Sequence, residues 1–123
     1  AGEGKVSTAG RAEYAVAIAG TAMDDAHAGK VYELAGDTSY TLSELAAEVA
    51  AQSGKPVAFV NLPQADYAKA LEGFGLPAGF AAVLAQCDAA AGQGALYDDS
   101  HTLSQLIGRP TTPMAASVRA ALG

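Results

Sequence analysis

Apolar residues recur along this chain at two different spacings. At the helical spacing of three to four residues they predict a helix over residues 11–23 and a second helix that begins after Thr41 and stops at Gly54. Further helices are expected from Pro63 to Gly75, from Pro77 onward, within residues 96–108 and over residues 114–122. The chain is therefore expected to be rich in helices.

The second spacing predicts short strands. Residues 5–9, 30–35 and 56–61 are brief runs in which β-branched and aromatic side chains alternate with others between glycine or proline residues. Strands joined through helices usually lie parallel in one sheet. We therefore expect an α/β fold, with a small, three-stranded, mainly parallel sheet and flanking helices, and one unit over residues 1–123. Because so narrow a sheet has two open edges, a neighbouring sheet portion is expected to be missing.

Local signals support individual helix ends. Thr41-Leu42-Ser43-Glu44 is a capping box, in which hydroxyl and carboxylate satisfy backbone donors of the first turn. Near the end of the chain, acceptor side chains precede a short apolar helix that Gly108 and Pro110 should close. These acceptors are Asp98, Asp99 and Ser100. The pair of aspartates thus indicates a helix cap rather than a metal site.

Composition and charge narrow the function classes. The net charge is −6, and no cluster of lysine and arginine exists to neutralise phosphates, so nucleic acid is excluded as an expected partner. No apolar run approaches the roughly 20 residues that cross a bilayer, and no secretory signal is seen. With a single cysteine, Cys87, no intrachain disulfide can form. A cytoplasmic protein is expected.

The chain shows no self-sufficient catalytic motif. The glycine-rich residues 73–79 join two predicted helices, whereas a dinucleotide loop must leave a strand. No tyrosine is followed by lysine at the spacing of a Tyr-x-x-x-Lys pair. His27 and His101 have no partners at a metal-binding spacing. Cys87 shares an apolar stripe with Phe80 and is expected to be an inert core thiol. We expect no metal ligands and no catalytic residues here.

Several blocks of sequence nevertheless carry a family resemblance. They are Arg11-Ala12-Glu13-Tyr14-Ala15, the run from Gly29 to Gly36, the run from Thr41 to Ala46, Leu76-Pro77, and the run from Leu103 to Thr112. In this order they resemble the C-terminal half of bacterial NAD(P)H:quinone oxidoreductases. That family is the NmrA-like, atypical branch of the short-chain dehydrogenases, and the resemblance extends over essentially all 123 residues.

The resemblance implies the C-terminal part of a Rossmann-type fold, in which this region forms one wall of the quinone-binding cleft. In such enzymes an N-terminal nucleotide-binding half, with a glycine-rich loop for NADPH or NADH, precedes this region. That half is not found here, and the sequence begins with Ala1-Gly2-Glu3-Gly4-Lys5, which reads like the interior of a longer protein. We therefore expect no cofactor-binding residues, no turnover by this chain alone, and an exposed surface that binds the nucleotide-binding half or self-associates.

Two other interpretations stay open. Related NmrA-like proteins sense nucleotides or contact other proteins without catalysis, so the chain could be a binding or regulatory module, or a structural fragment without a function of its own. If a quinone cleft exists, an apolar wall with one hydroxyl suits a planar ring. On that ground the candidate substrate contacts are Phe80, Leu84 and Tyr97, although plain core packing is the commoner use of such apolar helical stripes.

Overall fold

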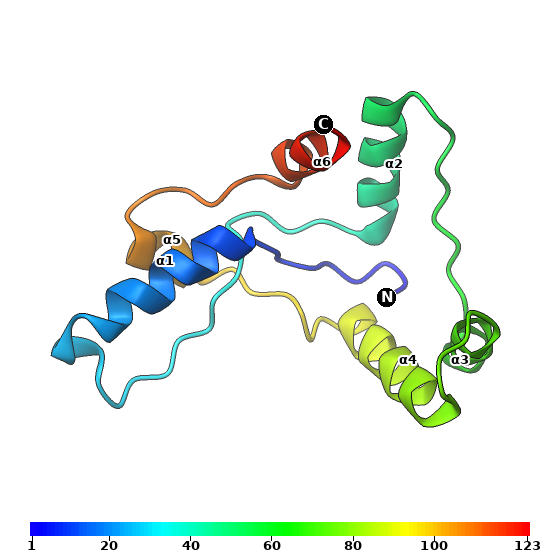
Figure 1. Cartoon of the computed structure of the whole chain (residues 1–123), viewed down its shortest axis with the longest axis horizontal. Coiled ribbons are helices and arrows are strands. Elements are labelled where there is room, and N and C mark those ends of the chain that lie inside the picture. The colour runs from blue at the N-terminus through cyan, green and yellow to red at the C-terminus, as the bar shows by residue number, and fades with distance from the viewer.

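The computed structural model describes residues 1–123 and consists of helices joined by long connections (Figure 1). The elements are α1 (Arg11–Ala22), a 3-10 turn η1 (Asp25–His27), α2 (Leu42–Ser53), α3 (Gln64–Gly73), α4 (Ala78–Gly92), α5 (Thr102–Ile107) and α6 (Met114–Leu122). Each expected helix is present within a few residues of its predicted bounds, except that α5 occupies only the second half of residues 96–108. None of the helices combines the length and hydropathy that crossing a bilayer requires.

The predicted helix ends are confirmed at several positions. The Thr41 hydroxyl accepts the Glu44 amide proton while the Glu44 carboxylate accepts that of Thr41, so the capping box before α2 is complete. Gly54 and Gly108 close α2 and α5 in the left-handed conformation, with φ of 69° and 72°. At the start of α5 the N-cap is His101, at φ 58°, and its side chain makes no capping hydrogen bond. Of the three expected acceptors, the Ser100 hydroxyl accepts a hydrogen bond from the Thr102 amide, the first of the helix.

The helices pack in pairs rather than around one centre. α3 packs on α4, α1 on α5, and α2 on α6, and Figure 1 shows these pairs spread apart. In α4 the buried side chains are alanines, with Ala81 and Ala85 fully covered, which lets α3 approach closely. Leu103 of α5 is the largest fully buried side chain.

Three connections cross where these helix pairs meet: the segment before α1, the segment between η1 and α2, and the segment between α4 and α5. Val6 and Tyr40 exchange backbone hydrogen bonds, the Ser7 amide donates to the Leu96 carbonyl, and the Gly36 amide donates to the Ser7 carbonyl. The backbones of two of these connections lie so close that a Cβ on Gly36 would fall 2.0 Å from the Thr8 carbonyl oxygen. Only glycine fits this crossing without a shift of the backbone.

The expected three-stranded sheet is not formed, and this part of the predicted fold class is wrong. The structure contains one isolated antiparallel bridge, between Val6 and Tyr40, and no strand. Residues 30–35 and 56–61 follow long connections that run apart (Figure 1). No backbone hydrogen bond engages residues 31–35 or 56–62. A strand requires a neighbour in the hydrogen-bonding direction, and these segments have none within the chain.

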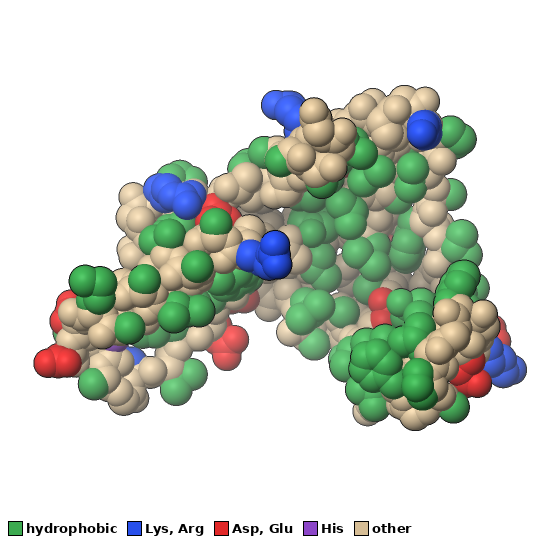
Figure 2. All heavy atoms as spheres, viewed as in Figure 1, with side chains coloured by type: hydrophobic (Ala, Val, Ile, Leu, Met, Phe, Trp, Pro, Cys, Tyr) green, Lys and Arg blue, Asp and Glu red, His purple; other side chains and the backbone are tan.

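The chain accordingly has a small interior. Only 12 of 123 residues are buried, and large apolar side chains such as Met23, Val31 and Phe74 are more than four-fifths exposed. Figure 2 shows apolar atoms exposed in several places on one face, including the region of the α3–α4 pair. Many of the large apolar side chains are thus uncovered.

Candidate functional site

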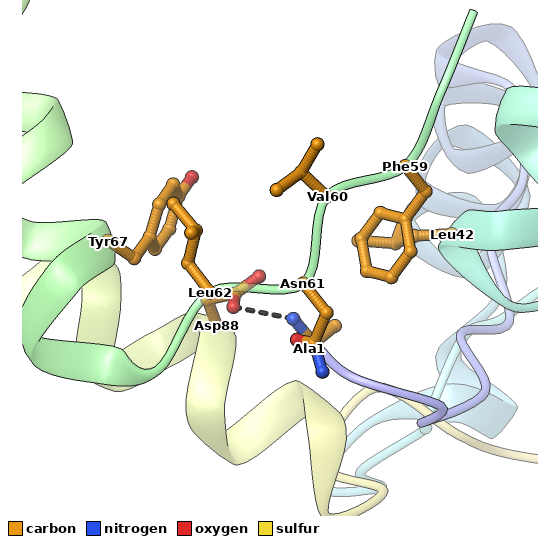
Figure 3. Close-up of a pocket in the computed structure, with 8 residues that line it drawn as sticks. All are labelled: Ala1, Leu42, Phe59, Val60, Asn61, Leu62, Tyr67 and Asp88. Atoms are coloured by element: carbon orange, nitrogen blue, oxygen red, sulfur yellow. Dashed lines mark hydrogen bonds and ion pairs between the residues drawn. The ribbon is translucent and has the colours of Figure 1, made fainter.

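A small hollow lies between the start of α2, the connection before α3, and the helices α3 and α4. Its volume is about 110 Å³. We call it the inner hollow; it is lined by Ala1, Leu42, Phe59, Val60, Asn61, Leu62, Tyr67 and Asp88. In Figure 3 the Tyr67 ring stands on one side of the space, and Phe59 and Leu42 stand on the other. The hollow is therefore flanked by two aromatic rings.

Local sequence signals place these side chains. The capping box fixes the start of α2, so Leu42 is its first helical residue. Pro63 is the N-cap of α3 and puts Tyr67 one turn into that helix. Pro77 is the N-cap of α4, whose later turns carry Leu84 and Asp88. Three helix starts therefore determine the shape of the hollow.

A second, larger space adjoins the first. This outer groove has a volume of about 280 Å³ and shares Ala1, Leu42, Tyr67 and Asp88 with the inner hollow. Its further lining residues are Val6, Leu84, Cys87, Ala91 and Leu96, so Asp88 is the one lining residue that is not hydrophobic. Together the two spaces offer an apolar site with a polar edge, which is the usual character of small-molecule sites.

The polar edge consists of three side chains. The Tyr67 hydroxyl and the Asn61 amide have no hydrogen-bond partner in the structure, while the Asp88 carboxylate pairs with the Ala1 amino group. Tyr67 is half-buried and Asn61 is exposed. The site can therefore offer a hydroxyl donor from Tyr67 and an amide donor from Asn61 to a bound molecule.

The three candidate substrate contacts from the sequence are not brought together. Leu84 lines the outer groove. Tyr97 lines a different space of about 250 Å³, beside Tyr14 and Leu34. Phe80 is 54% exposed and borders none of these spaces. All three stay predictions.

The apolar stripe of α4 faces a different way from the one expected. Cys87 is exposed rather than buried, and Val83 is 52% exposed. The reason is that α4 packs through its alanines, which leaves the larger side chains outward. The sequence does not mark Phe59 and Asn61, which fall in the predicted strand 56–61, or Tyr67, which falls in the predicted helix from Pro63 to Gly75, as site residues. No spacing signal marks them, because they converge only through the fold.

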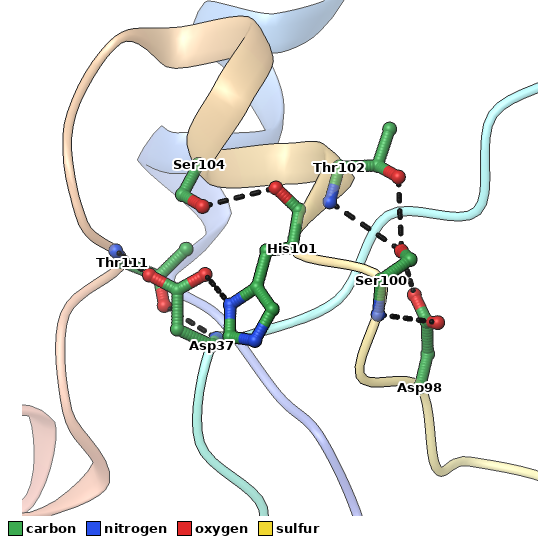
Figure 4. Close-up of polar contacts among 7 residues, drawn as sticks. All are labelled: Asp37, Asp98, Ser100, His101, Thr102, Ser104 and Thr111. Atoms are coloured by element: carbon green, nitrogen blue, oxygen red, sulfur yellow. Dashed lines mark hydrogen bonds and ion pairs between the residues drawn. The ribbon is translucent and has the colours of Figure 1, made fainter.

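A polar cluster fastens α5 to the crossing connections (Figure 4). Asp37 accepts a hydrogen bond from the Thr111 amide at 2.9 Å, and its other oxygen lies 2.9 Å from Nδ1 of His101. The Thr111 amide, followed by Ser104 and His101, lowers the pKa of Asp37. Asp98 meanwhile accepts from the Ser100 amide within the loop before α5, so it shapes that loop instead of capping the helix.

A second carboxylate, Glu13, fastens the connection between α5 and α6. It is 2% exposed. It accepts hydrogen bonds from the Gly10 amide, from the Thr112 amide and hydroxyl, and from Arg109. Burial alone would raise the pKa of Glu13, but these hydrogen bonds outweigh it and lower the pKa. The closing motif from Gly108 to Thr112 thus binds two carboxylates.

Neither the potential metal ligands nor the glycine-rich residues 73–79 form a site. No group of three or more His, Cys, Asp or Glu side chains gathers as metal ligands. The glycine-rich residues 73–79 join α3 to α4, as expected from the sequence, and follow no strand. The adjoining inner hollow and outer groove are therefore the candidate site.

The chain is similar in sequence to part of two known reductases. No family profile matches it. The chain is 55% identical over 118 residues to quinone oxidoreductase 2 of Escherichia coli strain K12, which covers 96% of this chain and 41% of that protein. It is 27% identical over 119 residues to the NAD(P)H azoreductase of Xenophilus azovorans, covering 97% of this chain and 42% of that protein. The chain spans about two-fifths of the length of these relatives.

Solved structures agree with the sequence comparison. The NADPH-dependent quinone oxidoreductase QOR2 of Escherichia coli, in complex with NADPH, superposes with a TM-score of 0.95 at 53% identity, covering 100% of this chain and 44% of that one. The triphenylmethane reductase of Citrobacter sp. superposes with a TM-score of 0.88 at 31% identity, covering 99% of this chain and 42% of that one. The open arrangement of helices described above is therefore found within larger reductases.

Proposed function

Because this chain is homologous to the C-terminal part of the NAD(P)H-dependent quinone oxidoreductases, we propose that it is the substrate-side portion of such an enzyme. The resemblance noted in the sequence is confirmed by these comparisons. The proposal is that residues 1–123 act as one unit that supplies a wall of the quinone site. Turnover then requires a nucleotide-binding portion in addition to this chain.

The observation that carries the proposal is the pair of backbone segments without partners. Residues 31–35 and 56–62 make no backbone hydrogen bonds, yet their composition favours strands. Unpaired extended backbone is a template for another strand. It supports a partner that supplies neighbouring strands, and a nucleotide-binding half is the partner that the relatives' greater length suggests.

The cofactor belongs, in this proposal, to that other half. The azoreductase relative is named for NAD(P)H and the quinone oxidoreductase QOR2 for NADPH, and the chain has no glycine-rich loop between a strand and a helix. NADPH would therefore enter the assembled enzyme through the partner. This chain would contribute the apolar surface against which an acceptor lies.

The acceptor contacts Phe80, Leu84 and Tyr97 remain part of the proposal. Leu84 has the strongest support, because it lines the outer groove beside Tyr67. Tyr97 and Phe80 lie on surfaces that another portion of the enzyme could cover, since they are 47% and 54% exposed. Their contribution depends on how the nucleotide-binding half docks.

Reconstitution tests the proposal. The purified chain is assayed with NADPH and a small quinone, alone and after its coding sequence is joined to the remaining portion of the Escherichia coli quinone oxidoreductase. We expect no turnover by the chain alone and NADPH-dependent quinone reduction by the joined protein. As a control, the joined protein is assayed without NADPH. Turnover by the chain alone, or a folded joined protein without activity, would contradict the proposal.

A further inference from the structure

The inner hollow has the dimensions and chemistry of a site for one aromatic ring. Its volume of about 110 Å³ is of the order of the roughly 150 Å³ apolar cavity that holds benzene in an engineered protein. Aromatic side chains border it on opposite sides, Tyr67 from α3 and Phe59 from the connection before it (Figure 3). A flat ring placed there would contact both.

The groups at the edge of the hollow suit a quinone. A quinone is a planar, uncharged ring with two carbonyl oxygens that only accept hydrogen bonds. The Tyr67 hydroxyl and the Asn61 amide are donors without partners in the structure. The Asp88 carboxylate at the same edge is paired with the Ala1 amino group, so Tyr67 and Asn61 supply the donors that stay free for a carbonyl oxygen.

We propose that the inner hollow binds the ring of a neutral quinone, with the Tyr67 hydroxyl donating a hydrogen bond to one carbonyl oxygen. Larger ring systems extend into the outer groove, past Leu84. This inference rests on the proposed function, and it assigns a residue that the sequence did not single out. Tyr67 is a binding residue in this proposal, and the hydride donor lies outside the chain.

The binding test uses the chain and duroquinone, whose ring carbons are all substituted so that the exposed Cys87 thiol has no free carbon to add to. The amide NMR signals of ¹⁵N-labelled chain are followed during titration. We expect shifts at Tyr67, at residues 59–62 and at residues 84–88. Replacement Tyr67→Phe removes only the hydroxyl and should weaken binding roughly three- to tenfold, the range of one hydrogen bond.

A matched control is available at the far end of α1. The Tyr32 hydroxyl lies 2.6 Å from Nδ1 of His27, away from the inner hollow. Tyr32→Phe therefore removes a hydroxyl of the same kind and should leave the dissociation constant for duroquinone unchanged. Shifts confined to other residues, or equal affinity after Tyr67→Phe, would overturn the inference.

Kinetics of the joined protein separate this inference from the proposed function. With Tyr67→Phe we expect KM for duroquinone to rise by the same factor as the dissociation constant while kcat changes little. Unchanged KM in an active enzyme overturns the inference and leaves the proposed function standing. An enzyme that reduces no quinone overturns the proposed function, while the titration still decides whether Tyr67 binds the ring.

Discussion

Glu13 shows how one buried charge can connect distant parts of this chain. Its carboxylate caps the first turn of α1 through the Gly10 amide and also holds Thr112, which lies 99 positions away. Charged acceptors form stronger hydrogen bonds than neutral ones. Because these bonds lower the pKa of Glu13 despite its burial, the ionised form stabilises the fold.

The destabilisation caused by removing this charge should depend on pH in a specific way. The contribution of Glu13 is fully present above its ordinary pKa of 4.5 and is lost as the pH falls through the lowered folded-state pKa. We expect Glu13→Gln to cost roughly 2 kcal/mol at pH 7, about the value of one hydrogen bond to a charged group, and less in acid. Urea unfolding followed by circular dichroism measures both.

The control for this change is Glu72→Gln, at an exposed glutamate of α3, which should leave stability unchanged. A destabilisation by Glu13→Gln that stays constant from pH 7 into acid would contradict the assigned role of the charge. Nothing local in the sequence identifies Glu13, because its partners Arg109 and Thr112 are brought to it only by the fold. By contrast, the cap at Thr41 and the turn at Gly54 were predictable, since their partners are a few residues away.

At the scale of elements, helices were predictable and strands were not. A helix closes its hydrogen bonds within itself, so periodicity and caps suffice to locate α2 and α6. A strand closes them with a neighbour, and residues 30–35 and 56–61 have no neighbour in this chain. The same limit applies to the site. The apolar stripe of α4 was expected to face the core, but Cys87 and Val83 on that stripe face outward.

Hydrogen exchange should reveal these segments directly. In the isolated chain, amides of residues 31–35 and 57–62 have no acceptors and should exchange within seconds, whereas amides inside α2 and α4 should be protected. In the protein joined to a nucleotide-binding portion, we expect residues 31–35 and 57–62 to gain protection of at least tenfold. Mass spectrometry of peptic peptides measures both states, and equal exchange in both would contradict docking through these segments.

At the scale of the whole molecule, apolar surface outweighs interior. Side chains such as Ile18, Val31, Val60 and Phe74 are more than three-fifths exposed, and no core covers them. Exposed apolar area of this kind usually marks an interface. The net charge of −6 makes copies of the chain repel one another, and salt screens this repulsion.

We therefore expect the isolated chain to self-associate as its concentration rises, and more strongly at high salt. Light scattering coupled to size exclusion measures the mass, which is 12.2 kDa for one copy. The double variant Val31→Lys with Val60→Lys places charges on the uncovered surface and should shift the equilibrium toward single copies. A mass of one copy at all concentrations and salt levels would contradict this prediction.

The long reach of the polar contacts has a consequence for how the chain is made. The bonds that fasten its parts join residues 74, 91 and 99 positions apart, at Asp37 and Thr111, Ser7 and Asp98, and Glu13 and Thr112. During synthesis, residues 1–40 leave the ribosome long before these partners exist. A nascent chain that ends before Thr111 therefore keeps its local helices and lacks the bonds by which Thr111 and Thr112 hold Asp37 and Glu13 in place.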